Sequence, residues 1–439
     1  MNAPAPASGP PLVQRVRPRD LRLLNDACAV VLLAWYLLPA FKIVARSEVF
    51  AAALGLWGIT AFCIRRDWLS VKGSHIVPLA LWYAVFALNF VFGRSTLFGE
   101  YLFIMTVFFT PALLFHFYRR TEQTDRIVFF SRLILALLCV TAVTTLIGQF
   151  RYPIPSRTLS KGIESYTLLY SSQNIGGFGF TYGLMLYTVA LAAFARNLGK
   201  GLAQVAYLAL IVFFMGVIVK TEFTIAVALV ALGVALALAL KPRRAAVVAL
   251  WVVAAALLAV LLFDALSPFM QGITAAIGSN TIRDRVQDVI RFLSTGELGG
   301  DFALRADKYA VSVRTALAQP FLGAGAWYGY DTEAKGIGGH VELFDTLARY
   351  GLAGAVPLAW FFVANLRDTA RLMRGAPMVA GMPAFFALFA LYAATNTFFT
   401  SSEIGLVLFF AVPAMAYWSS PNPGVGQGLA LAAHAPKVG

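Results

Sequence analysis

Apolar residues in this chain are gathered into blocks rather than spread evenly along it. The blocks are about 17 to 25 residues long, which is the length of a helix that crosses the hydrocarbon core of a bilayer. The pattern predicts an all-α integral membrane protein with about twelve transmembrane helices, at residues 27–44, 49–64, 76–92, 97–117, 127–149, 175–195, 202–219, 223–240, 245–264, 352–366, 378–396 and 403–418.

Charges between the blocks predict the orientation. Alternate short connections are basic and would face the cytoplasm under the positive-inside rule. They carry Arg65, Arg66 and Lys72; Arg119, Arg120 and Arg126; Arg196 and Lys200; Lys241, Arg243 and Arg244; and Arg367, Arg371 and Arg374. Topology therefore explains the formal net charge of +14 better than a nucleic-acid partner does.

This orientation divides the chain into five parts. The first apolar block lacks a small-x-small cleavage site behind it, so we expect a retained span rather than a signal peptide. The expected order is a cytoplasmic tail (1–23), spans one to nine (24–264), a periplasmic loop (265–351), spans ten to twelve (352–418) and a cytoplasmic tail (419–439). In a Gram-negative cell the membrane would be the inner membrane, and the outer face, with the long loop and His340, would be periplasmic.

One polar stretch, "GGHVELFDTLARYGLAGAV" at residues 338–356, stands out from the apolar background. It predicts a short amphipathic helix on the outer membrane surface that ends at Gly351, with Asp345 and Arg349 as an i, i+4 pair. The apolar face would hold Leu343, Phe344, Leu347 and Tyr350, and the polar face Glu342, Asp345 and Arg349.

His340 falls at the head of that helix, where the helix dipole disfavours an imidazolium and keeps the ring able to accept a proton. A lone histidine is also a common cap or packing residue. Lys220, at the mouth of span seven, and Arg305, in the outer loop, are cations that need an anionic partner. A lipid-linked phosphate or diphosphate would fit, although Glu222 is an alternative local partner for Lys220.

Several motifs are absent. The sequence holds no Asp-x-Asp pair, no Glu-x-x-His, no phosphate-binding P-loop and no dinucleotide fingerprint. Cys28, Cys63 and Cys139 lie inside apolar blocks at spacings that suit neither disulfides nor a metal. We therefore expect neither a metal nor another cofactor, and if the chain is an enzyme, its energy should come from an activated substrate.

These residues resemble the family of O-antigen ligases and Wzy-type polysaccharide polymerases. The stretch from His340 resembles the family's His-x-x-x-Leu-x-x-Leu-x-x-x-Gly-Leu-x-Gly signature. Arg305, Tyr309 and "QPFLGAGAWYGY" resemble the run that precedes it, "VKTEFTIAVALVALG" resembles a Ser-Lys-Thr step before a span, and "SQN" at residues 172–174 resembles a Pro-Asn entrance.

The resemblance implies a GT-C-like glycosyltransferase that acts without a metal and with inversion. The donor would be a glycan linked to undecaprenyl diphosphate, and the acceptor a glycan or lipid A core. His340 would be the base, with Arg305, Lys220, Glu222, Asn174 and Arg314 as substrate-binding candidates. Lys220 takes the place of the family's first arginine, and Val341 stands where the family has asparagine.

Three functions stay open. The first is a polymerase that joins lipid-linked repeat units in the bilayer, with a flippase and a chain-length regulator as possible partners. The second is a ligase that moves the finished chain to lipid A core or another acceptor. The third is a secondary transporter, which twelve spans also permit, although the midplane lacks a convincing charged site.

Overall fold

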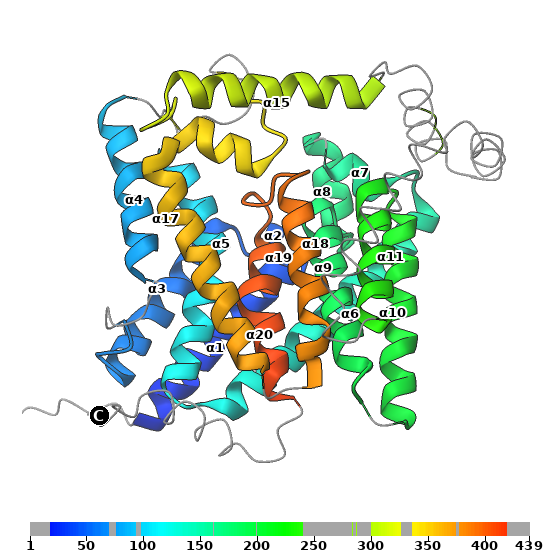
Figure 1. Cartoon of the computed structure of the whole chain (residues 1–439). Coiled ribbons are helices and arrows are strands. Elements are labelled where there is room, and N and C mark those ends of the chain that lie inside the picture. The colour runs from blue at the N-terminus through cyan, green and yellow to red at the C-terminus, as the bar shows by residue number, and fades with distance from the viewer. Residues whose placement is uncertain are drawn as a thin grey trace, which may run out of the picture.

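The computed structural model describes residues 18–69, 76–93, 98–160, 162–198, 200–239, 283, 287, 300–325, 336–374 and 377–418. Within these ranges the secondary structure is helical, without strands (Figure 1). The helices of the first half are α1 (Pro18–Leu37), α2 (Pro39–Val44), α3 (Ser47–Ile64), α4 (Ile76–Val91), α5 (Phe98–Arg120), α6 (Thr124–Arg151), α7 (Pro155–Leu159), α8 (Glu164–Ser172) and α9 (Phe178–Ala195). Those of the second half are α10 (Leu202–Lys220), α11 (Thr224–Ala239), α15 (Gly300–Ala318), α17 (Glu342–Met373), η2 (Pro377–Ala380), α18 (Met382–Ala393), α19 (Ser402–Leu406), η3 (Val407–Ala411), α20 (Val412–Ala414) and η4 (Met415–Tyr417).

The described part has the architecture of a multi-pass helical membrane protein. Six of its helices are long and apolar enough to cross a bilayer, and four shorter apolar helices accompany them. Each predicted apolar block that falls in the described residues is helical, whereas the block at 245–264 lies outside them. Twelve crossings and a GT-C architecture therefore stay predictions.

The first predicted block, 27–44, is wrong as a single helix. The chain leaves the helical conformation at Leu38 (φ −108°, ψ 98°) and starts again at Pro39. Proline disfavours the helical conformation of the residue before it, which explains the break. Helix α1 begins at Pro18, before the first predicted block.

Helix α9 lies at the centre of the bundle. It packs against α10, α11, α18 and α19, and its side chains are buried from Phe180 to Ala195. Its position among these helices explains this complete burial. Gly183 allows the close approach of α19, because an added methyl group there would lie 3.3 Å from Cβ of Glu403.

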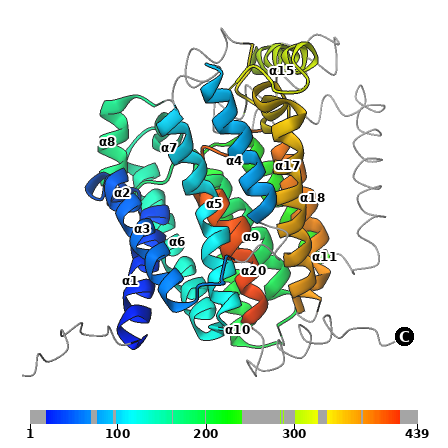
Figure 2. The same ribbon diagram turned by 90° about the vertical axis from the view of Figure 1, so that its left-hand side faces the viewer.

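Helix α15 lies across one end of the bundle, above the start of α17, as the two perpendicular views show (Figures 1 and 2). Helix α17 turns sharply at Gly351 (φ 57°), so its first part, 342–350, is separated from the longer part that follows. The predicted helix end at Gly351 is thus confirmed as a break in direction, although the second part runs to Met373 rather than to residue 366.

The glycine-rich turn after α15 stabilises this break. Ala324 N–H donates to the carbonyl of Ala348 (2.7 Å), and Leu352 N–H donates to the carbonyl of Pro320 (2.7 Å). These bonds satisfy backbone groups that the bend in α17 releases from regular helix bonding. The glycine-rich segment around residue 320 and the segment that begins at His340 were both singled out in the sequence. These bonds show that the two segments contact each other directly.

A polar cavity at the His340 segment

A polar cavity with a volume of about 630 Å³ lies beside the His340 segment. Its wall combines α2, α7, α9, α15, the start of α11 and the connection between α18 and α19. The charged or titratable side chains on it are Lys42, Arg157, Glu222, Arg305, His340 and Glu403. A second cavity, beside His116 and Asp368, is far smaller at about 30 Å³, which is room for about one water molecule.

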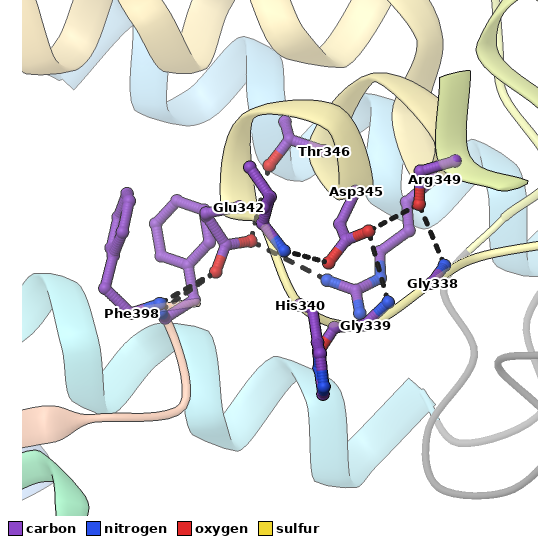
Figure 3. A network of polar contacts seen from close by, with 11 residues as sticks. Gly338, Gly339, His340, Glu342, Asp345, Thr346, Arg349 and Phe398 are labelled. Atoms are coloured by element: carbon purple, nitrogen blue, oxygen red, sulfur yellow. Dashed lines mark hydrogen bonds and ion pairs between the residues drawn. The ribbon is translucent and has the colours of Figure 1, made fainter. Parts of the chain in front are cut away.

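His340 lies in the connection that leads into α17, two residues before the helix begins. Its Nδ1 lies 2.9 Å from the carbonyl oxygen of Gly339. In the neutral ring, Nδ1 therefore carries the proton and donates to that oxygen, which leaves Nε2 as the acceptor. Figure 3 shows the ring pointing away from the polar network around Asp345.

The environment of His340 favours the neutral ring. Burial lowers its pKa from the ordinary 6.5, and Lys308 and Arg305 lower the pKa further by charge repulsion. The hydrogen bond with Gly339 and the charge of Asp345 act in the opposite direction without reversing the shift. A neutral ring was expected from the helix dipole, but the main cause is burial.

Asp345 fixes the backbone around His340 (Figure 3). Its Oδ1 accepts hydrogen bonds from Ser312 Oγ (2.6 Å) and Gly339 N–H (3.2 Å), and its Oδ2 accepts one from Val341 N–H (3.2 Å). Ser312 Oγ in turn accepts from Gly338 N–H (2.8 Å). Because Ser312 belongs to α15, Asp345 connects the histidine segment to the helix that carries Arg305.

Glu342 connects the same segment to the opposite side. Its Oε2 accepts hydrogen bonds from the N–H groups of Phe398 (3.0 Å) and Phe399 (3.3 Å). Its Oε1 lies 3.6 Å from Nη1 of Arg349. Both side chains are almost fully buried, at 4% exposure for Glu342 and 11% for Arg349.

The predicted orientation of the amphipathic helix is therefore wrong. Glu342 and Asp345 are buried, whereas Leu343 is 56% exposed. Arg349 forms its ion pair with Glu342 instead of the expected Asp345. The reason is that the carboxylates accept hydrogen bonds from backbone N–H groups and a buried hydroxyl, which compensates for their removal from water.

Arg305 and Arg314 lie on opposite faces of α15, because nine residues are two and a half helical turns. Arg305 lines the cavity, and its Nη1 donates to the carbonyl of Thr395 (3.4 Å). Arg314 is exposed, lies outside the cavity lining and donates to the carbonyl of Ala310 on its own helix (3.2 Å). The expected substrate contact of Arg314 does not fit this placement.

Lys220 and Glu222 are separated as well. Glu222 lines the cavity, at a left-handed backbone position (φ 59°). Lys220 is exposed and lies outside the lining, with its Nζ 5.3 Å from the centre of the Phe150 ring. An ion pair between Lys220 and Glu222, which was the alternative from the sequence, is not found among the described residues. The structure therefore brings Glu222, but not Lys220, together with Arg305 and His340.

Asn174 has a structural position rather than a place in the cavity wall. Its Nδ2 donates to Oγ1 of Thr141 (3.1 Å) and of Thr144 (3.2 Å), and its Oδ1 accepts from Ala40 N–H (3.3 Å). The side chain thereby joins α6 to α2. Since these bonds occupy both ends of the amide, the expected substrate contact is not supported.

Sequence reasoning missed Lys42, Arg157 and Glu403, although all three line the cavity. Lys42 Nζ forms an ion pair with Glu403 Oε1 at 2.7 Å. Each of these two residues is a single charge within a predicted span, and charges there commonly mark functional sites. That signal was present in the sequence for Lys42 and Glu403, whereas Arg157 had no distinguishing context.

Comparisons with known proteins give no further identification. No protein-family model matches this chain, and no curated protein matches its sequence. Fold and site together define a multi-pass helical membrane protein with a polar, mixed-charge cavity at one end of its bundle.

Proposed function

We propose that the chain is an inner-membrane glycosyltransferase that polymerises lipid-linked glycans at the periplasmic face. The observation that carries this proposal is the convergence of Arg305 and His340, from separate segments, on one cavity of about 630 Å³. A cation for the leaving diphosphate and a neutral imidazole for the acceptor hydroxyl are the two groups that such a transfer requires.

The proposed step begins at Nε2 of neutral His340, which removes the proton from an acceptor hydroxyl. The oxygen attacks the anomeric carbon from the side opposite the diphosphate, so the configuration is inverted. The bond between that carbon and the phosphate oxygen breaks, and its electron pair leaves with the diphosphate. General-base catalysis of this kind contributes about 100-fold to 10,000-fold in rate.

Arg305 would stabilise the negative charge that develops on the diphosphate. Its planar guanidinium can pair with two phosphate oxygens, and a cavity partly shielded from water strengthens such a contact. No group of three or more His, Cys, Asp or Glu side chains that could hold a metal ion occurs in the described ranges. In this proposal Arg305 supplies the charge neutralisation.

The test is complementation of a deletion strain with His340→Ala or Arg305→Ala, compared with the wild type at equal protein level. Both variants should lose long surface glycan. Arg314→Ala is the matched control, because it removes the same charge from the exposed face of the same helix. Normal surface glycan from both cavity variants would refute the enzymatic proposal and favour the secondary transporter.

The phenotype also separates the polymerase from the ligase. Lipid A core that carries a single repeat unit is expected when polymerisation is lost. Long glycan that stays on the lipid carrier is expected when ligation is lost, because the chain is then completed but not transferred. The first result would support the polymerase, and the second the ligase, with the same donor chemistry in either case.

A further inference from the structure

The cavity wall also carries the ion pair between Lys42, on α2, and Glu403, on α19. Lys42 Nζ also donates to Ser402 Oγ (3.2 Å) and lies 5.0 Å from the centre of the Trp35 ring. The two side chains are 28% and 12% exposed, and both line the cavity. The carboxylate is therefore held in one position at the surface of a solvent-filled space.

The surroundings of Glu403 suit a polyhydroxylated ring. Polar side chains of the connection between α18 and α19 extend the wall on one side, namely Asn396, Thr397, Thr400, Ser401 and Ser402. Aromatic side chains provide another part of the wall, namely Phe178, Tyr182 and Phe223. A flat apolar surface combined with a few fixed polar groups is the arrangement by which a cavity binds and orients a small ligand.

We infer that Glu403 and the aromatic side chains around it form a sugar-binding subsite, in which the Glu403 carboxylate accepts a hydrogen bond from a glycan hydroxyl. Lys42 is a positioning residue, because its ion pair with Glu403 fixes the direction of this carboxylate. The inference rests on the proposed glycosyl transfer and deepens it. It places a specificity-determining residue in the same cavity as Arg305 and His340.

Close packing supports a fixed carboxylate rather than a mobile one. A methyl group added at Gly179, on α9, would overlap Oε2 of Glu403. The connection between α18 and α19 is also held at its middle, where Glu342 accepts the N–H groups of Phe398 and Phe399. The two walls of the cavity are thus joined through one short segment, so a ring bound at Glu403 has a defined position relative to His340.

The experiment measures glycan binding by the purified full-length protein in detergent, with isothermal titration calorimetry. The probe is the oligosaccharide that mild acid releases from the lipid-linked pool of a strain lacking this chain. Glu403→Gln should weaken its affinity about tenfold, since hydrogen bonds to charged groups are the stronger ones. Glu48→Gln is the matched control, because it neutralises an exposed carboxylate on α3 and should leave the affinity unchanged.

A purely structural ion pair is separated from a subsite by the charge exchange Lys42→Glu with Glu403→Lys. This double variant should recover the thermal stability that either single variant loses, because an ion pair is restored. It should not recover glycan affinity, because the carboxylate then lies on α2. Unchanged affinity in Glu403→Gln, or affinity recovered by the charge exchange, would overturn the inference.

Failure of the subsite and failure of the proposed function give different results. Inorganic diphosphate should lose affinity in Arg305→Ala and keep it in Glu403→Gln. If Arg305→Ala keeps diphosphate affinity while Glu403→Gln loses glycan affinity, the catalytic proposal fails and the subsite stands. If the strain that lacks this chain holds no lipid-linked glycan, both the subsite and the proposed function are refuted.

Turnover measurements identify the glycan that occupies the subsite. If Glu403→Gln raises the KM for a free oligosaccharide acceptor, the bound ring belongs to the acceptor. If it raises the KM for the lipid-linked glycan instead, the ring belongs to the donor. A kcat that falls with both KM values unchanged would contradict a binding role.

Discussion

The two walls of the cavity are built in different ways. The wall with His340 and Arg305 is made of segments that lie within about a hundred residues of each other, and a network around Asp345 and Glu342 holds it together. The wall with Lys42 and Glu403 joins positions 361 residues apart, through one ion pair between α2 and α19. Part of the first wall can be read from a local sequence pattern, whereas the second exists only once the bundle has formed.

The largest expected effect on stability comes from Glu342→Ala, which leaves the nearly buried Arg349 without its carboxylate partner. Removing one member of a buried ion pair costs about 3–5 kcal/mol. Thermal unfolding in detergent should show this loss, and Glu342→Ala combined with Arg349→Met should recover part of it. A loss below about 1 kcal/mol in the single variant would show that the network does not hold this wall.

Next is Asp345→Ala, which leaves the hydroxyl of Ser312 and the N–H groups of Gly339 and Val341 without their acceptor. We expect a loss of about 1–3 kcal/mol in stability. Because a displacement of about 1 Å can cost about 100-fold in rate, glycan transfer should fall more than stability does. Asp307→Ala, at an exposed position of α15, is the control, and equal activity of the two variants would contradict a positioning role.

Beside Glu403, Gly179→Ala introduces a methyl group that would overlap Oε2 of that residue. We expect a cost of about 1 kcal/mol, at the low end for overpacking, because the end of a flexible side chain can move. Glycan affinity should fall together with stability. Gly216→Ala is the control, since an added methyl group there meets nothing within 4 Å, and it should leave both quantities unchanged.

Much of the fold could be predicted from the sequence, because apolar blocks of spanning length need a helix to satisfy their backbone in lipid. The break before Pro39 could also have been read, from the proline itself. Three of the predicted site residues line the cavity, namely His340, Arg305 and Glu222. The other three, Lys220, Arg314 and Asn174, lie outside its lining.

The wrong orientation of Glu342 and Asp345 and the missed pair of Lys42 and Glu403 have a common physical cause. Periodicity assigns charged side chains to the solvent face, but Glu342 and Asp345 turn inward, because backbone N–H groups of other segments need acceptors there. Likewise, Lys42 and Glu403 are recognisable as isolated charges, but their pairing depends on the contact between α2 and α19 across the bundle. Sequence patterns record the local part of a site and omit the part that tertiary packing assembles.

The smallest effect is expected from Lys308→Gln, which removes a cation that lowers the pKa of His340. The proposed base must be neutral, so transfer should decline as the pH falls through this lowered pKa. Without Lys308 that decline should begin at a higher pH, while the rate at pH 7.5 should change by less than about twofold, because the ring is neutral there in both proteins.

The lowered pKa of His340 also makes the stability of the fold depend on pH. Folded His340 binds fewer protons than the unfolded chain below about pH 6.5, so its contribution to stability is present above that pH and is lost as the pH falls. Arg314→Gln, the control on the exposed face of α15, should leave the rate profile in place. A profile that Lys308→Gln also leaves unchanged would show that titration of His340 does not set the acid limit.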